Sequence, residues 1–137
     1  MVYSERVMEV SESYARSIKE IAVSFLERVA SGDVRGAFED YTGNDFCHHN
    51  PYFRGDPESL MLAMEDNAVK NPDKRFEVKR AMADEEKVAV HSHVRQNPGD
   101  PGAVVVHIFR FQHGRIVELW DIGQPIPEDP VNENGVF

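Results

Sequence analysis

Two hydrophobic periodicities divide this chain into a helical first half and an extended second half. From about Ser4 to Ala30, apolar residues recur every three or four positions, which predicts one long amphipathic helix ending at Ser31-Gly32. A second, short helix is predicted from Val34 to Tyr41, with Asp33 as its cap. A third is predicted from Pro57 to Asn71, because proline is favoured in the first turn of a helix. The apolar positions of the long helix are Val7, Val10, Tyr14, Ile18, Ile21, Ala22, Phe25, Leu26 and Val29.

The second half of the chain has the alternation and the turn residues of β-strands. Four strands are predicted to form an antiparallel meander, and they cover Arg75 to Ala83, Lys87 to Arg95, Val104 to Phe111 and Ile116 to Ile122. A brief earlier strand, Phe46 to His49, stops at Asn50-Pro51. Three helices and this meander predict an α+β fold, in which a curved sheet wraps over the long helix as a cone and leaves a pocket at the mouth of the cone.

Length and composition predict a single domain. The chain has 137 residues and is 41% hydrophobic, which suffices for one core but not for two ordinary domains. We divide it into a helical part, about 4–71, a meander, about 74–123, and an extended tail, 124–137. The proline-rich tail either wraps the body or a partner subunit, with Val136-Phe137 as an apolar anchor, or is disordered.

The charge balance and the single cysteine argue against several classes of function. There are 15 Lys and Arg against 24 Asp and Glu, and the net charge of -9 repels nucleic acid and anionic membranes. The polar segment after Met1 resembles neither a signal peptide nor a membrane span, so we expect a cytoplasmic protein. Cys47 alone forms no internal disulfide and no cysteine cluster for a metal. Its neighbour His48 points to the other face of a strand, which argues against a cysteine nucleophile.

The turn at His113-Gly114 decides which side chains of the last two strands share a face. A two-residue turn places His107 opposite Trp120 and separates His107 from Asp121. A three-residue loop with its glycine in the left-handed conformation shifts the register by one residue. One face then carries Val105, His107, Phe109, Phe111, Val117, Leu119 and Asp121, and the other carries Val106, Ile108, Arg110, Ile116, Glu118 and Trp120. We prefer this register because it pairs opposite charges on one face and leaves the other apolar except for an imidazole and a carboxylate.

His107 and Asp121 are the candidate catalytic residues. A carboxylate on an apolar face loses its hydration, which raises its pKa and suits it to act as a general base or acid near neutral pH. In the competing interpretation, Asp121 lies exposed at the strand end or bonded to nearby backbone, and His107 is a hydrogen-bonded core residue.

The remaining histidines leave several alternatives open. His91 and His93 share one face of a strand. If that face points inward, they contact the substrate or bind a transition metal together with His107; if it points outward, they belong to a polar surface at a subunit contact. We assign no metal site. His49 ends the brief strand at the predicted pocket mouth, where it either contacts the substrate or caps the following turn, and His48 is expected to point away.

The second face of the final hairpin predicts a homodimer. Trp120, Ile116 and Ile108 would form an unusually large apolar surface on a monomer. We therefore expect the sheets of two subunits to pack face to face through these residues.

Three segments resemble the SnoaL-like polyketide cyclases of the nuclear-transport-factor-2-like superfamily. They are Phe46-Cys47-His48-His49-Asn50-Pro51, Ala89-Val90-His91-Ser92-His93-Val94 and Gly114-Arg115-Ile116-Val117-Glu118-Leu119-Trp120-Asp121. The order of elements is similar from about Ile18 to Phe137. The resemblance implies an intramolecular aldol closure that needs neither metal nor organic cofactor. In that reaction Asp121 removes a proton next to a carbonyl, and His107 or His49 stabilises the enolate oxygen.

On this basis we expect an enzyme of lyase or isomerase type that acts on a hydrophobic carbonyl compound. The predicted substrate contacts are His49, Phe53, His91, His93, Phe109 and Leu119. Because one fold supports many reactions, the alternative is a non-catalytic dimeric domain that binds a small molecule.

Overall fold

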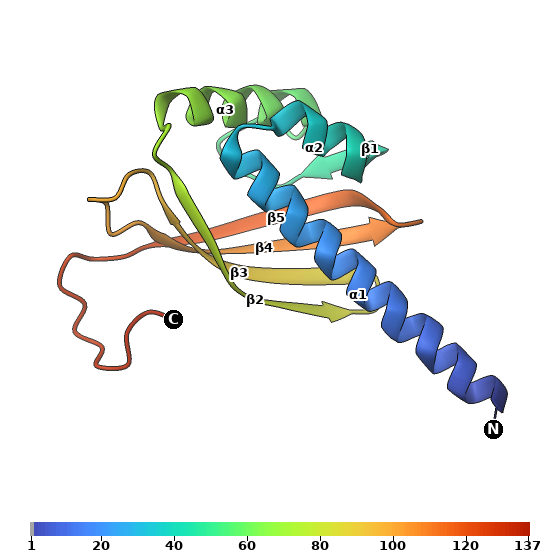
Figure 1. The fold of residues 1–137 in the computed structure, drawn as a ribbon. Helices are drawn as coiled ribbons and strands as arrows, with labels where there is room; N and C mark the ends of the chain where they lie inside the picture. The colour runs from blue at the N-terminus through green and yellow to red at the C-terminus, as the bar shows by residue number, and fades with distance from the viewer. Residues whose placement is uncertain (1) are drawn as a thin grey trace.

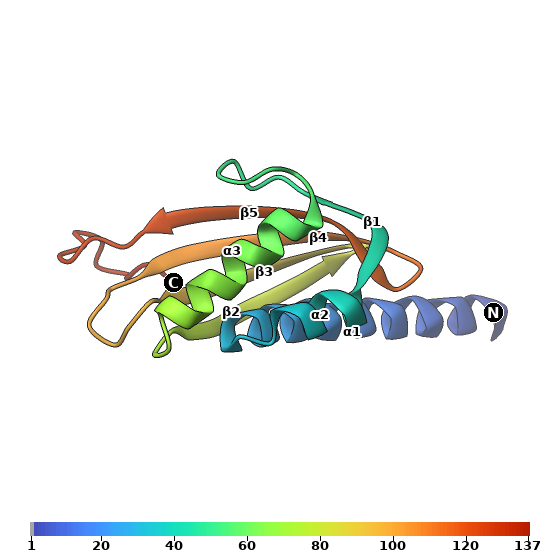
Figure 2. The same ribbon diagram turned by 90° about the horizontal axis from the view of Figure 1, so that it is seen from above.

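The computed structural model describes the backbone of residues 2–137 and the side chains of residues 11–137. It contains the helices α1 (Val2–Ser31), α2 (Val34–Tyr41) and α3 (Pro57–Lys70), and the strands β1 (Thr42–His48), β2 (Arg75–Asp84), β3 (Lys87–Arg95), β4 (Ala103–Gln112) and β5 (Arg115–Pro125). The helices lie together on one face of the sheet (Figures 1 and 2), which confirms the predicted α+β class. The predicted apolar positions Val7 and Val10 lie outside the described side chains.

Local sequence signals set where the helices begin and end. Gly32, at a φ of 102°, ends α1, and the backbone N–H of Asp33 donates to the carbonyl of Arg28 at 2.9 Å, as in a glycine-terminated helix. The Asp33 carboxylate makes no capping hydrogen bond to α2, which corrects the prediction; it accepts from Arg28 Nε at 2.8 Å instead. Asp56 caps α3, because its carboxylate accepts from the backbone N–H of Ser59 at 2.9 Å.

The sheet has five strands in the order β1-β5-β4-β3-β2. The last four form the predicted antiparallel meander, whereas β1 pairs with β5 in parallel. The predicted meander is confirmed, and the sheet as a whole is mixed rather than antiparallel throughout, because the brief strand around Phe46 occupies the open edge of β5. The pairing continues past β1, where the backbone N–H of His49 donates to the carbonyl of Leu119 at 2.9 Å. The segment that follows β1 is thereby held against the far end of β5.

The core lies between the sheet and the helices and contains a chain of aromatic rings. Phe25 of α1 packs edge-on against Phe38 of α2, with ring centroids 5.2 Å apart, and against Phe109 of β4, at 5.9 Å. Phe38 in turn packs against Phe46 of β1 at 5.6 Å. Edge-to-face packing adds about 0.5–1.5 kcal/mol per pair to the burial of the rings. These contacts join both helices to both edges of the β1-β5-β4 region.

The other face of the sheet is partly covered by the C-terminal tail, which has neither helix nor strand after Pro125. The Phe137 ring lies 5.5 Å from the His91 ring and 5.0 Å from the His93 ring, both on β3. The tail therefore turns back over the outer face of the sheet, as one of the two predicted alternatives requires. Ile116 does not belong to this outer face, since its side chain is fully buried in the core.

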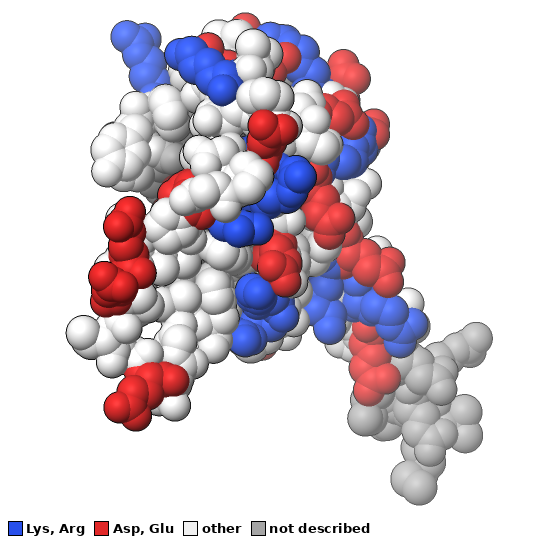
Figure 3. Space-filling model, turned by 60° about the vertical axis from the view of Figure 1, so that its left-hand side comes forward, with Lys and Arg blue, Asp and Glu red and all other residues white. Residues whose placement is uncertain are grey.

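Charged side chains of both signs are interspersed along α1, and neither sign dominates the surface seen in Figure 3. A helix with mixed charges on its outer side is the ordinary pattern of an amphipathic surface helix. Among the helices whose residues the structure describes, none is long and apolar enough to cross a membrane.

Candidate active site

A cavity of about 320 Å³ opens between the sheet and the helices α1 and α3. Every strand from β2 to β5 contributes to its wall, together with the segment after β1. The lining residues are Leu26, Val29, Ala30, Asn50, Met64, Asn67, Lys74, Phe76, Val94, Gln96, Val105, His107, Asp121, Ile122 and Gly123. The wall is therefore mostly apolar, with a smaller number of polar side chains, as is usual for small-molecule sites.

His107 and Asp121 both line this cavity, because they are directly paired across β4 and β5. The predicted face is correct, but the predicted turn is not. His113 and Gly114 form a two-residue turn with positive φ angles of 53° and 77°, which suits a tight hairpin. A β-bulge at Val117 then shifts the register by one residue. The bulge brings the imidazole and the carboxylate to the same face.

The same bulge explains why Ile116 faces the core. Before the bulge Ile116 pairs with Phe111, whose side chain is fully buried, and after it Glu118 pairs with Arg110 on the outer face. The predicted register assumed one uninterrupted alternation along β5, so it assigned Ile116 to the outer face. An extra residue within a strand inverts the alternation on one side of the bulge only.

The environment of His107 keeps its imidazole neutral. Burial lowers the pKa of His107 from 6.5 to about 4, and the positive charge of Lys74 acts in the same direction, while the negative charge of Asp121 opposes both. The Nδ1 atom of His107 is buried and has no hydrogen-bond partner among the described residues. At neutral pH this ring offers one N–H donor and one lone pair, without a charge.

Asp121 is held by an amide from a distant part of the chain. Asn50 Nδ2 donates to Asp121 Oδ2 at 2.8 Å. The amide cannot turn round freely, because Asn50 Oδ1 accepts from the backbone N–H of Tyr52 at 3.0 Å. The Asn50 backbone N–H donates to His48 Nδ1 at 3.2 Å. This arrangement orients one carboxylate oxygen and leaves the carboxylate at the cavity wall.

His48 supports this loop from inside the protein. Its side chain is only 5% exposed, so the prediction that it points away is wrong. Cys47 pairs with outward-facing Glu118 in the parallel ladder, and His48 pairs with inward-facing Leu119. The alternation along β1 therefore turns His48 inward and its neighbour His49 outward.

Lys74 is the one cation that lines the cavity among the described residues. It follows α3 and precedes β2, and its Nζ donates to Asn67 Oδ1 at 2.8 Å. Burial lowers the pKa of Lys74, because an ammonium group loses hydration in the cavity wall. Since an ammonium group has three N–H donors, donors remain for a bound ligand.

Gln96, at the end of β3, adds a further polar group to the wall. Its Oε1 is buried and has no hydrogen-bond partner among the described residues. A buried acceptor without a partner is unfavourable by about 1–3 kcal/mol, which a ligand donor would relieve.

Sequence reasoning missed Asn50, Lys74 and Gln96. In the sequence, the Asn50-Pro51 pair indicates only a turn, and Lys74 and Gln96 stand in no distinguishing pattern.

Several predicted substrate contacts lie elsewhere in the structure. His49 lies on the outer face, where its ring stacks on Trp120 with centroids 5.0 Å apart and an interplanar angle of 8°. His91 and His93 also face outward, because β3 turns Val90 and Ser92 toward His107 and its neighbours. The predictions that these three histidines line the pocket are wrong. His91 and His93 are separated from His107 by the sheet, so the metal site considered for the three does not form.

The apolar contacts were also misplaced. Phe109 and Leu119 share the face of His107 and Asp121, but they lie deeper in the core, with 0% and 4% of their surface exposed. Phe53 lies in the exposed segment between β1 and α3. The walls near Asp121 come instead from α1, α3 and β2, which the sequence could not place against the hairpin.

A larger hollow of about 780 Å³ runs along α1 beside Ala81 of β2. Its lining side chains include Arg16, Lys19, Glu20 and Glu27. These belong to the charged outer side of the helix. We place the candidate active site in the smaller cavity, because that cavity contains the carboxylate, the imidazole and the partly buried ammonium group.

Comparisons with known proteins agree with the fold. The family model of the SnoaL-like domain matches residues 22–119. The structure resembles AclR of Streptomyces galilaeus, for which a hydroxylase activity is suggested, with a TM-score of 0.67 and 23% identity over 80% of this chain and 90% of AclR. It also resembles an NTF-2-like protein of unknown function from Burkholderia xenovorans LB400, with a TM-score of 0.66 and 21% identity over 85% of this chain and 89% of that one. At these identities the likeness extends to the fold alone. A comparison with curated proteins finds no match.

Proposed function

The chain belongs to the SnoaL-like domain family, and from this membership and the side chains of the cavity we propose that it catalyses proton transfer on a hydrophobic carbonyl compound. The reaction is an aldol-type ring closure or an isomerisation, carried out by acid–base catalysis. The observation that carries the proposal is the Asp121 carboxylate, which Asn50 orients at the wall of a mostly apolar cavity.

Asp121 is the proposed base. It accepts a proton from the carbon next to the substrate carbonyl, and the electron pair of that C–H bond moves into an enolate. A positioned general base typically contributes about 10²–10⁴-fold to the rate. The hydrogen bond from Asn50 to one carboxylate oxygen fixes the plane of the group and leaves the other oxygen to face the substrate.

The enolate oxygen needs a hydrogen-bond donor or a positive charge. Lys74 supplies both, because its ammonium group lines the cavity and is engaged by Asn67 through only one contact. His107 is neutral at working pH, so it acts as a hydrogen-bonding group and not as a second cation. Lys74 takes the place of His49 as the candidate hydrogen-bond donor to the enolate oxygen, because His49 faces away from the cavity.

The dimensions of the cavity suit a small, mostly apolar substrate. Its volume of about 320 Å³ is at the lower end of ligand pockets, which span roughly 300–1,000 Å³. Side chains such as Leu26, Val29 and Phe76 contribute apolar walls, while Gln96 and His107 place buried polar atoms without partners among the described residues. A ring compound with one or two carbonyl or hydroxyl groups matches this distribution.

Exchange of α-protons tests the proposal without knowledge of the natural substrate. The protein is incubated in D₂O with a bicyclic ketone such as 2-tetralone, and loss of the α-proton signals is followed by NMR. We expect exchange above the buffer rate with the wild type and a loss of about 10²-fold or more with Asp121→Asn. Asp84→Asn serves as the control, because it makes the same replacement of a carboxylate by an amide at an exposed position, at the end of β2.

A non-catalytic binding domain is the second candidate function, and the unpartnered polar atoms of His107 and Gln96 favour it. The two candidates differ in their response to Asp121→Asn. If the variant and the wild type bind the ketone equally and neither accelerates exchange across a panel of ketones, the binding function replaces the enzyme.

A further inference from the structure

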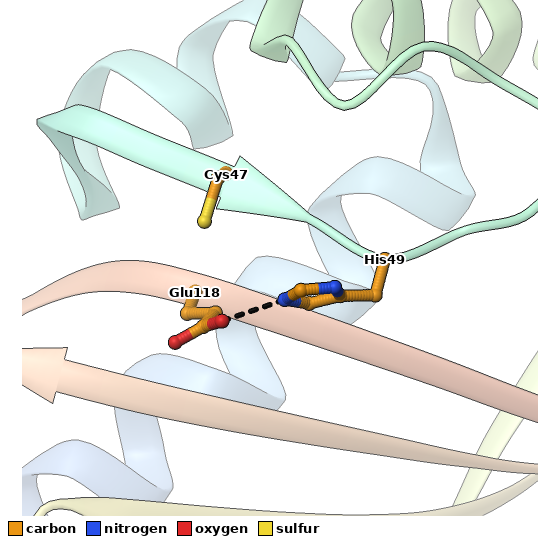
Figure 4. A group of neighbouring side chains, drawn as sticks. All are labelled: Cys47, His49 and Glu118. Atoms are coloured by element: carbon orange, nitrogen blue, oxygen red, sulfur yellow. Dashed lines mark hydrogen bonds and ion pairs between the residues drawn. The ribbon is translucent and has the colours of Figure 1, made fainter.

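Three side chains with metal-binding atoms meet on the outer face of the sheet, on the side opposite the cavity. They are Cys47 and His49, at the end of β1, and Glu118 of β5 (Figure 4). Their sulfur, imidazole nitrogen and carboxylate oxygen atoms all lie within 4.8 Å of one another. Figure 4 shows the His49 ring and the Glu118 carboxylate in line, with the Cys47 sulfur directed toward the same space.

The parallel pairing of β1 and β5 creates this cluster. Cys47 is the register partner of Glu118, so the two side chains project from neighbouring backbone positions. His49 lies two residues after Cys47, and its backbone N–H continues the pairing by donating to the Leu119 carbonyl at 2.9 Å. Because side chains alternate along an extended segment, positions two residues apart share a face. The backbone therefore fixes all three positions, and the ligand atoms do not depend on a flexible loop.

Neighbouring residues orient two of the three side chains. The His49 ring lies flat on Trp120 at 5.0 Å. Arg110 Nε donates to Glu118 Oε1 at 2.8 Å, which leaves Oε2 turned toward His49 Nε2, at 2.6 Å. Hydrogen bonds of this kind to an outer oxygen are typical of carboxylates that bind metals through the other oxygen.

We propose that Cys47, His49 and Glu118 form a binding site for a zinc-class divalent cation, with the fourth position open to water. Thiolate, imidazole and carboxylate are the three ligand types that Zn²⁺ takes in proteins, at about 2.3, 2.0–2.1 and 2.0–2.2 Å. A cation at those distances requires ligand atoms roughly 3–4 Å apart. The 2.6 Å contact between His49 and Glu118 would therefore open slightly, and the Cys47 sulfur, within 4.8 Å of both, would complete the set through a small adjustment of its side chain.

The local charge also fits a dication. A bound cation displaces the proton of the Cys47 thiol, so that a thiolate and the Glu118 carboxylate would together supply two negative charges. Arg110 lies on the other oxygen of Glu118, away from His49. Asp45, two residues before Cys47 on β1, adds a further negative charge on the same strand. The His49 side chain is 47% exposed, which gives an ion access from solvent. This site is separate from the proposed enzyme function, because it lies across the sheet from Asp121.

Titration of the full-length protein with Co²⁺ alone, in a phosphine reductant that keeps Cys47 reduced, tests the site. A cobalt–thiolate bond produces a charge-transfer absorption in the near ultraviolet, and added Zn²⁺ should remove it by displacement. Loss of an outer-shell partner alone weakens metal affinity by about 10-fold or more, so loss of a ligand should weaken it at least as much. We therefore expect Cys47→Ser to abolish the charge-transfer band, and His49→Gln and Glu118→Gln to weaken Co²⁺ binding by at least that factor.

Two controls make the result specific. His113→Gln removes an exposed histidine from the hairpin turn and should leave Co²⁺ binding unchanged. Asp121→Asn should also leave it unchanged, so that failure of the proposed enzyme and failure of the metal site give separate results. Circular dichroism verifies that each variant is folded. Absence of the charge-transfer band in folded wild type, or equal Co²⁺ affinity of wild type and Cys47→Ser, would show an ion-pair cluster with no metal site.

Discussion

Asn50 and Asp121 are 71 positions apart in the chain, yet their side chains meet in a hydrogen bond of 2.8 Å at the cavity wall. The contact depends on β1 pairing in parallel with β5, because that pairing carries the segment after β1 to the far end of the hairpin. The carboxylate that we propose as the base is thus oriented by a segment that belongs to the helical half of the sequence.

Removal of the Asn50 amide should impair the reaction more than the fold. A hydrogen bond to a charged group contributes about 1.5–3 kcal/mol, so Asn50→Ala should lower the rate of α-proton exchange by roughly 10- to 100-fold. The rate is measured by NMR in D₂O as for the wild type. Asn50→Ser, whose hydroxyl can still donate, should lose less. Equal rates for Asn50→Ala and the wild type would mean that Asp121 is oriented by other contacts.

The pKa of His107 should respond in opposite directions to its two charged neighbours. The positive charge of Lys74 lowers it and the negative charge of Asp121 raises it. Lys74→Met should therefore raise the pKa of His107, and Asp121→Asn should lower it further. The ring carbon signals of His107, followed by NMR against pH, provide both values without any substrate. Shifts in the same direction in both variants would contradict the arrangement of charges in the cavity.

The buried imidazole also predicts how stability depends on pH. In the unfolded chain His107 takes up a proton near pH 6.5, whereas in the folded protein it does so only near pH 4. Between these values the unfolded chain binds more protons, so the free energy of unfolding falls as the pH falls from about 6.5 to about 4. Protonation of His107 lowers the free energy of unfolding by on the order of 3 kcal/mol over this range, since a pKa difference of one unit corresponds to about 1.4 kcal/mol.

Urea unfolding of the wild type and of His107→Asn at pH 7 and pH 5 isolates this contribution. The other histidines and the carboxylates titrate in both proteins, so the difference between them reports His107. We expect the wild type to lose more stability than the variant on acidification. A parallel loss in the two proteins would show that His107 titrates normally in the folded state.

The homodimer predicted from the sequence stays a prediction, with a smaller surface than expected. Ile116 is buried in the core, and Phe137 covers His91 and His93, so Trp120 and Ile108 remain of the predicted contact residues. If a second copy packs on this face, Ile108→Glu should halve the mass measured by light scattering, because a buried unpaired charge strongly disfavours an interface. If the wild-type protein has the mass of a single chain in solution, the prediction of a homodimer is contradicted.

The local patterns of the sequence determined the helices, the strands and the face shared by His107 and Asp121. Periodicity carries this information because a helix or strand exposes side chains at fixed intervals whatever lies beyond it. The predicted length of the turn is wrong, yet the predicted pairing of those two residues is correct. The opposite charges of Arg110 and Glu118 and the positions of the apolar residues favour that register whichever feature produces it.

Only the tertiary structure decided what surrounds that pair. The bulge at Val117 turned Ile116 inward, and the position of β1 beside β5 turned His48 inward and His49 outward. The same sheet placed His91 and His93 on the side away from the cavity. Alternation along a strand gives two faces but does not say which is the inner one, because that depends on pairing with residues far away in the chain. For the same reason Asn50, Lys74 and Gln96 became part of the site only when three distant segments met.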